Sequence, residues 1–187
     1  MKAWLCAFAL IAHTALAETE PVSVEVSRQE GNTYHFQLQF TANGSSKQVL
    51  ALLTDYNQLA RLNPLIKSSR VIPTDSLDID RVEIITRGCM LFFCKTIRRV
   101  EDVTIANEQH IRSTIAPSLS DFKSGHTVWT FTPMGSQTLV HFQATMVPDF
   151  WLPPFIGPYT LKKQIRTQLE RTALKINQLL AAPTSTS

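Results

Sequence analysis

The stretch that decides the fold is Val147–Leu180, which reads VPDFWLPPFIGPYTLKKQIRTQLERTALKINQLL. Residues 148–158 contain four prolines. Proline lacks the amide hydrogen and fixes φ, so this part cannot be a central strand or an unbroken helix. From Thr160 to Leu180 there is no glycine or proline, and apolar residues recur every three or four positions along one helical face. The stretch predicts a long amphipathic helix, about 30 Å in length, that follows a stiff aromatic hinge.

The N-terminus has the pattern of a secretory signal. Lys2 supplies the positive charge, residues 3–16 carry none, and Ala15-Leu16-Ala17 fits the small-x-small cleavage pattern. We therefore predict a signal peptide at 1–17, cleavage after Ala17 and a periplasmic protein. An uncleaved amphiphilic anchor is the alternative.

Cleavage would leave a mature chain of 170 of the 187 residues, enough for one domain with a sizeable core. That domain is expected at 18–180, followed by a flexible polar tail at 181–187. The formal charge of +3 falls to +2 without Lys2, so the charge gives no reason to expect a nucleic-acid partner.

The mature chain keeps two cysteines, Cys89 and Cys94. Export to an oxidising compartment makes a disulfide the default, and the spacing suits a tight hairpin or bulge. Two free buried thiols or a redox-active pair are the alternatives, although the spacing is not C-x-x-C. No histidine lies close in sequence, so the pair is no recognisable zinc site. We expect neither a metal nor a cofactor.

Upstream of the long helix, short runs of alternating apolar and polar residues predict strands. A hairpin at 22–28 and 33–41 is followed by two short helices that end at Asn63-Pro64. Six more strands are expected at 67–73, 79–87, 94–105, 108–115, 122–133 and 138–147. Because short loops join antiparallel neighbours, the order predicts an α+β domain with an antiparallel meander sheet.

No catalytic constellation is evident. The mature histidines fall on the polar phase of their strands, where solvent-facing side chains are expected rather than a general base in a pocket. They are His35, His110, His126 and His141. No serine-hydrolase, zinc-protease or phosphate-loop motif occurs.

The strand at 94–105 alternates poorly, because Arg99 and Glu101 share a side with Ile97 and Val103. A charged side chain that points into the domain there would indicate a functional role. The alternative is that this segment is an edge strand or that a bulge shifts its register, so that the charges face solvent. The weak candidates for an enzymatic site are Arg99, Glu101, Ser113 and Glu83.

Several strings resemble the START-like (SRPBCC) superfamily, which has the helix-grip fold and is also described as the polyketide cyclase/dehydrase and lipid transport group. They are VLALLTDY at Val49–Tyr56, Asn63-Pro64, WTFTP at Trp129–Pro133, and the helix at Leu161–Leu180. The coenzyme Q-binding branch looks most similar. The resemblance implies a curved sheet around the last helix, with a cavity for an apolar ligand such as a lipid, sterol, quinone or polyketide. The signal and the cysteine pair depart from that branch, so its intracellular roles transfer poorly.

Inner-face positions of the strands and the apolar stripe of the helix would line this cavity. They are Phe36, Leu38, Val82, Ile84, Ile111, Ser113, Ile115, Trp129, Phe131, Phe142, Ala144, Met146, Leu161, Ile165 and Leu169. The hinge aromatics would form a gate or a membrane contact, with lysines nearby for anionic head groups, unless they plug the sheet as ordinary core. These residues are Phe150, Trp151, Phe155, Tyr159, Lys162 and Lys163.

The predicted function is a periplasmic binding or transfer protein for an apolar ligand held between the sheet and the last helix. A cyclase or hydrolase acting on an apolar substrate in the same cavity is one alternative. A ligand-free interaction domain with a filled core is the other.

Overall fold

The structure, a computed structural model of the 187-residue chain, describes residues 22–29, 32–90, 93–151 and 158–182. The expected signal peptide, the hinge residue Phe155 and the end of the tail lie outside the described residues.

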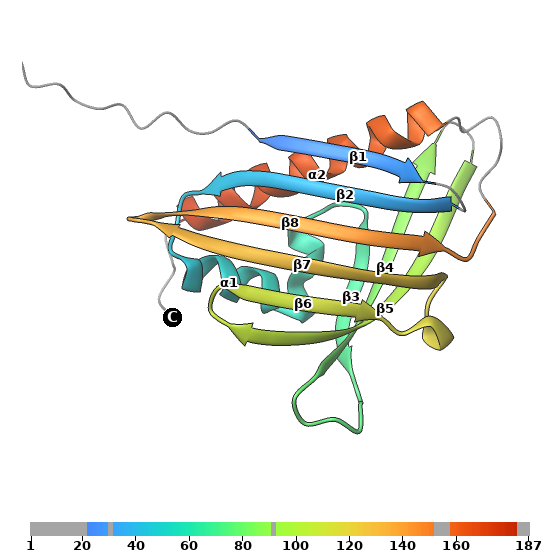
Figure 1. Cartoon of the computed structure of the whole chain (residues 1–187), viewed down its shortest axis with the longest axis horizontal. Coiled ribbons are helices and arrows are strands. Elements are labelled where there is room, and N and C mark those ends of the chain that lie inside the picture. Colours follow the sequence, from blue (N-terminus) through green and yellow to red (C-terminus); the bar gives the residue numbers. More distant parts are fainter. Residues whose placement is uncertain (1–21, 30–31, 91–92, 152–157, 183–187) are drawn as a thin grey trace, which may run out of the picture.

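In the described part of the chain, eight antiparallel strands form one sheet that curves around the helix α2 (Figure 1). The strands are β1 (Ser23–Gln29), β2 (Thr33–Ala42), β3 (Ile66–Ile72), β4 (Asp80–Met90), β5 (Phe93–Asn107), β6 (His110–Ile115), β7 (Phe122–Met134) and β8 (Gln137–Pro148). Their order is β1-β2-β8-β7-β6-β5-β4-β3. The predicted meander is confirmed from β3 to β8. The first hairpin joins it through β2 and β8, where Leu38 lies opposite Phe142.

The helices follow the expected order. After the first hairpin come α1 (Ser46–Thr54) and the 3₁₀ turn η2 (Tyr56–Arg61), and a further 3₁₀ turn, η3 (Pro117–Leu119), lies in a predicted break between strands. Ser45 is the N-cap of α1 and forms a capping box with Gln48. The long helix is α2 (Pro158–Ala181). The α+β helix-grip fold is therefore confirmed.

The two halves of α2 meet the sheet differently. In the C-terminal half, Ala173 and Ile176 are fully buried in the main core against the inner face of the sheet. Asn177 ties the same half to the first hairpin, because its side chain donates to the Thr41 carbonyl at 2.9 Å and accepts from the Asn43 amide at 2.8 Å. In the N-terminal half, Ile165 and Leu169 are only half-buried. The helix therefore closes one end of the sheet and leaves space at the other.

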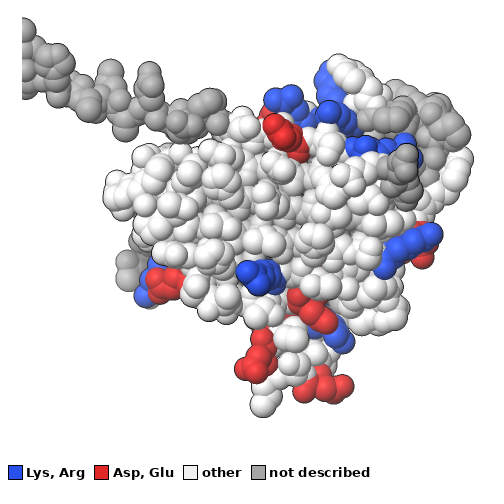
Figure 2. Space-filling view, viewed as in Figure 1, with Lys and Arg blue, Asp and Glu red and all other residues white. Residues whose placement is uncertain are grey.

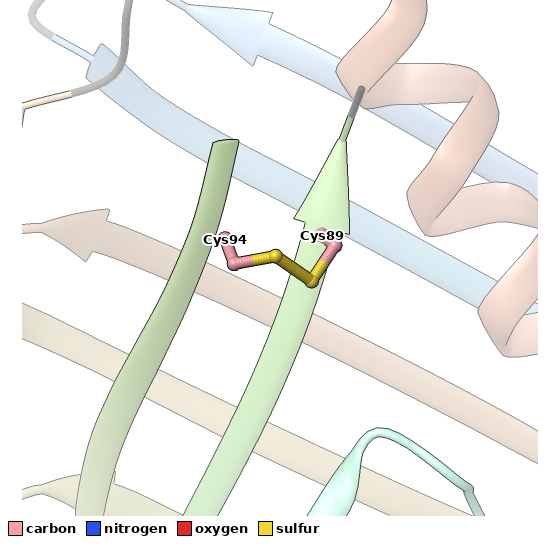
Figure 3. The surroundings of a disulfide bond; sticks show 2 residues. All are labelled: Cys89 and Cys94. Atoms are coloured by element: carbon pink, nitrogen blue, oxygen red, sulfur yellow. A yellow bond between two sulfur atoms is a disulfide. The ribbon is translucent and has the colours of Figure 1, made fainter. Parts of the chain in front are cut away.

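Cys89 and Cys94 form the predicted disulfide, which joins facing residues near the tip of the β4–β5 hairpin (Figure 3). Their Cα atoms lie 4.0 Å apart. The bridge holds together the two strand ends that face the start of α2 (Figure 1).

Replacing both cysteines by serine is expected to lower the free energy of unfolding by about 2 kcal/mol, the low end of the usual range, because the bridge closes a short loop. Urea unfolding of the oxidised protein and the double variant measures this difference. Reduction serves as the internal control, since it should shift the wild-type midpoint and leave the variant unchanged. An unshifted midpoint after complete reduction would contradict the prediction.

Candidate functional site

The larger of two adjoining cavities, about 320 Å³ in volume, lies between the N-terminal half of α2 and the tips of β4 and β5. The strand phase of β2 turns Tyr34 and Phe36 toward it, and α2 contributes one face through Leu161, Ile165 and Leu169. Other lining side chains include Leu65, Phe93, Ile97, Phe122, Met146 and Phe150. Lys95 is the only charged residue among the described lining residues. This cavity therefore suits an apolar molecule.

A second cavity of about 290 Å³ lies deeper, between η2 and the middle strands. Its apolar lining includes Leu38, Leu59, Ile84, Ile111, Trp129 and Phe142. The two cavities share Asn63, Leu65, Thr86 and Leu169 as lining residues, so they adjoin along this common wall.

The cavities bring together most of the residues that the sequence places on the inner face. Phe36, Met146, Leu161 and Ile165 line the first, Leu38, Ile84, Ile111, Ser113, Trp129 and Phe142 line the second, and Leu169 lines both. Val82, Ile115, Phe131 and Ala144 are buried but line neither cavity. They belong to the packed core, and any contact of these fifteen residues with a ligand stays a prediction.

Sequence reasoning missed the contribution of η2 and the turn after it, which supply Tyr56, Leu59, Leu62 and Asn63 to the second cavity. Short helical segments have weak periodicity, and their docking depends on tertiary contacts. It also missed the lining residues of β5, although Phe93, Lys95 and Ile97 do alternate. The charged Lys95 within this series obscured its apolar alternation.

Polar side chains gather at the far wall of the second cavity. Glu101 is 8 % exposed, and Ser113 and Thr127 are each 5 % exposed. The Ser113 hydroxyl donates to Glu101 Oε2 at 3.0 Å and lies 2.6 Å from Thr127 Oγ1. Arg99 Nη2 lies 3.7 Å from Glu101 Oε1. The structure thus places Arg99 and Glu101 on the inner face rather than at an edge.

Two groups on residues that line the second cavity have no hydrogen-bond partner among the described residues. They are the Tyr56 hydroxyl and Arg99 Nε, and both atoms are buried. Burial raises the pKa of Tyr56 far above its ordinary value, and the negative charges of Asp80 and Glu101 act in the same direction. Tyr56 therefore keeps its proton and remains able to donate a hydrogen bond.

Glu83, the fourth enzymatic candidate, lies on the opposite face of β4 from the cavity residue Ile84. Its carboxylate accepts hydrogen bonds from Arg70 Nε at 2.6 Å and Arg98 Nε at 2.7 Å. These two bonds lower the pKa of Glu83. Glu83 therefore belongs to an ion-pair cluster of the outer face and is not part of the cavity wall.

Glu83→Gln is expected to destabilise the protein at neutral pH by on the order of 1 kcal/mol or less, because both arginines are largely exposed. A carboxyl whose folded pKa is lowered stabilises the fold above its unfolded pKa, about 4.3, and loses that effect as the pH falls through the folded pKa. The difference between wild type and variant should therefore shrink in acid. Urea unfolding at pH 7 and pH 3 measures it, and a difference independent of pH would contradict the assignment.

The histidines lie outside both cavities, as their strand phase predicts. His126 is exposed and the other three are half-buried, with His35 Nδ1 3.0 Å from Thr145 Oγ1. Across the described ranges, no group of three or more histidine, cysteine, aspartate or glutamate side chains is arranged to hold a metal ion.

The described hinge residues differ in exposure. Phe150 is half-buried, packs edge-on against Phe122 and has Lys95 Nζ 4.9 Å from its ring centroid. Trp151 and Tyr159, in contrast, are 67 % and 77 % exposed, so neither plugs the sheet as core. Lys162 and Lys163 are exposed as well, and Figure 2 shows basic side chains gathered over the start of α2. None of the helices within the described ranges is long and apolar enough to cross a membrane.

Comparison with solved structures finds the same fold in several proteins. The STAR-related lipid transfer protein of Xanthomonas axonopodis is 13% identical, with a TM-score of 0.68 over 88% of this chain and 96% of that one. A START superfamily protein from Mycobacterium smegmatis is 15% identical, with a TM-score of 0.62 over 78% and 96%. The Zhui aromatase/cyclase from Streptomyces sp. R1128 is 12% identical, with a TM-score of 0.54 over 79% and 91%. At these identities the likeness shows the fold alone.

No curated protein matches the sequence significantly. The family model described as polyketide cyclase / dehydrase and lipid transport matches residues 33–176, which is most of the chain. The resemblance to the START-like superfamily is thereby confirmed, while the link to the coenzyme Q-binding branch stays a prediction. The chain belongs to the polyketide cyclase/dehydrase and lipid transport family.

Proposed function

We propose that this protein binds an apolar ligand in the two adjoining cavities beneath the N-terminal half of α2 and carries it through the periplasm. The proposal rests on the two cavities themselves. The first has a volume of about 320 Å³ and an apolar lining, the deeper one has a volume of about 290 Å³, and the two share a wall. Each volume lies near the lower end of the range for small-molecule sites, roughly 300–1,000 Å³, and together they fit a larger ligand. The lipid transfer protein from Xanthomonas, which has the same fold, supports a carrier role.

Titration with the neutral fluorescent probe N-phenyl-1-naphthylamine tests the proposal. Saturable enhancement at one probe per chain is the expected result, and native mass spectrometry of the protein as purified would identify a co-purified ligand. A folded protein that binds neither the probe nor a native lipid would overturn the carrier role and favour an interaction domain with a filled core.

Export is the second part of the proposal. The Cys89–Cys94 disulfide supports it, because such bonds persist in oxidising compartments. The intact mass of the protein from a periplasmic extract tests the cleavage site. A chain that begins at Glu18 is expected, whereas a protein found only in the cytoplasm with residues 1–17 attached would overturn this part.

The third part is a membrane contact at the mouth of the larger cavity. Phe150 lines that cavity, and Trp151, which follows it, is exposed. Exposed aromatics favour the membrane–water interface, and Lys162 and Lys163 would attract anionic head groups. A carrier that loads from a membrane needs such a surface beside its entrance.

Vesicle co-sedimentation tests this contact. Wild-type protein should bind phosphatidylethanolamine–phosphatidylglycerol vesicles, and salt should weaken the binding because the lysines contribute. Trp151→Ala with Tyr159→Ala should lower the bound fraction severalfold while the fold is retained. Leu174→Ala removes an exposed apolar side chain elsewhere on α2 and serves as the control. Undiminished binding by the folded double variant would overturn the membrane contact.

An enzymatic role is the second candidate, and the buried Ser113–Glu101 hydrogen bond favours it. A carboxylate that accepts from a serine hydroxyl in a cavity is an arrangement that can activate a nucleophile. The Zhui aromatase/cyclase, which shares the fold, also keeps this option open. Hydrolysis of p-nitrophenyl decanoate tests the hydrolase form of this role. Activity lost in Ser113→Ala would support it, and equal rates for the protein and buffer would count against it.

A further inference from the structure

The one charged side chain in the described lining of the larger cavity, that of Lys95, lacks an acidic partner. It is half-buried and belongs to the inward series of β5 with Phe93 and Ile97. The ion pairs of the described residues all use other cations. Lys95 Nζ lies 4.9 Å from the ring centroid of Phe150. An aromatic ring replaces only part of the hydration that a half-buried ammonium group loses, so this wall can still bind an anion.

Open space lies beside this charge. Gly88 is the residue opposite Lys95 in the pairing of β4 with β5, and it lines the same cavity. A Cβ atom added to Gly88 would have no heavy atom of the described residues within 4 Å, its chain neighbours apart. Its φ is not positive, so the backbone does not require a glycine here. A glycine inside a strand often marks a close approach by a ligand, and here the missing side chain leaves room for one next to the ammonium group.

The two cavities differ in the charge that they can accept. The buried carboxylate of Glu101 lines the deeper cavity, where a second negative charge would be repelled strongly in surroundings of low dielectric. Lys95 lies at the outer cavity instead, beside Phe150, which precedes the exposed Trp151. An anionic group of a ligand would therefore stay near the mouth, and its apolar part would point inward.

We propose that the larger cavity selects an apolar ligand with an anionic head group, a carboxylate or a phosphate, which pairs with Lys95 in the space over Gly88. The proposal rests on the proposed ligand-binding function and deepens it, since it names the charge of the ligand and the end that faces the mouth. The apolar chain would extend past Thr86 and Leu169 into the deeper cavity, because both residues line the two cavities.

Displacement of N-phenyl-1-naphthylamine at pH 8 by a chain-matched series tests the proposal: dodecanoate, dodecyl phosphate, 1-dodecanol and dodecyltrimethylammonium. At least one of the two anions should bind about fivefold to tenfold more tightly than the alcohol, and the cation should bind most weakly. The head group with the higher affinity identifies the source of the ligand. A preferred carboxylate indicates a fatty acid, and a preferred phosphate indicates a lipid with a phosphate head group.

Two variants test the two parts of the site. Lys95→Met should lower the affinity for the preferred anion to that for the alcohol and leave the alcohol unchanged, because methionine keeps an apolar side chain beside Phe150 without the charge. Lys95→Arg should retain the preference. Gly88→Leu keeps the lysine but fills the space beside it, so it should weaken the preferred anion by a similar factor.

Lys67→Met is the matched control, since Lys67 is exposed, donates to the Pro64 carbonyl at 3.0 Å and lines neither cavity. It makes the same change of charge and should leave the preference for the anion intact. An alcohol or a cation that binds as tightly as both anions, a retained preference in folded Lys95→Met or Gly88→Leu, or an equal loss in Lys67→Met would overturn the head-group assignment while the apolar site stands. If none of the four compounds displaces the probe, the proposed ligand-binding function itself fails.

Discussion

Replacing Ile176 by alanine is expected to lower the free energy of unfolding by about 2–5 kcal/mol, the usual range for a large-to-small change in a packed core. Ile176 is fully buried, and it lies in the C-terminal half of α2 within the main core. The side chain sits where the helix closes the curved sheet, so a cavity left there cannot be filled by solvent-facing neighbours. Because domains of this kind have a total stability of roughly 5–15 kcal/mol, the variant should be close to the limit of folding.

The control for this variant lies two residues away on the same helix. Leu174 is 56 % exposed, so Leu174→Ala should change the free energy of unfolding by about 0.5 kcal/mol or less. Urea unfolding followed by circular dichroism measures both variants. Equal effects of the two substitutions would mean that α2 does not pack on the sheet through its buried face. The described position of the cavity beneath the other half of α2 would then be wrong as well.

The parts of the fold that the sequence predicts are those with strong local signals. The periodic apolar stripe of α2 and the alternation in β2 extend over many residues. The buried face of each element can therefore be predicted from its own sequence alone. The disulfide was also predictable, because its two cysteines lie close together in the sequence. The short loops between consecutive strands predicted the meander from β3 to β8 correctly.

What the sequence does not predict depends on contacts between distant segments. The pairing of β2 with β8 places Leu38 opposite Phe142. These strands are far apart in the sequence, and no turn between them indicates that they pair. The position of Tyr56 over the cavity depends on how η2 docks against β3, where Ser69 Oγ accepts a hydrogen bond from the Leu59 amide at 3.2 Å.

The candidate site was harder to predict than the fold because its polar residues break the pattern that marks an inner face. In β5 the inward series includes Lys95, Arg99 and Glu101, which read as exposed residues in a hydropathy pattern. A strand that carries charges into a cavity looks irregular in sequence. That irregularity was the useful signal for Arg99 and Glu101, whereas for Glu83 the opposite phase of β4 placed the carboxylate on the outer face.

Leu169→Trp is expected to weaken the binding of N-phenyl-1-naphthylamine by more than about tenfold while the protein stays folded. Leu169 is half-buried and lines both cavities, so a larger side chain there would fill space on each side of the common wall. Overpacking a rigid core costs about 1–3 kcal/mol, but an existing cavity accepts added volume with less strain. Fluorescence titration measures the affinity, and circular dichroism verifies the fold.

Leu174→Trp places the same side chain on the exposed face of α2 and should leave the probe affinity unchanged. The comparison separates a filled cavity from a general effect of an added tryptophan. If Leu169→Trp retains the wild-type affinity in a folded protein, the probe binds outside the space beneath α2, and the apolar cavity is not the ligand site. If it loses affinity and also resists urea better than the wild type, the added ring has filled an empty space that the native sequence keeps open at a cost in stability, as a binding site requires.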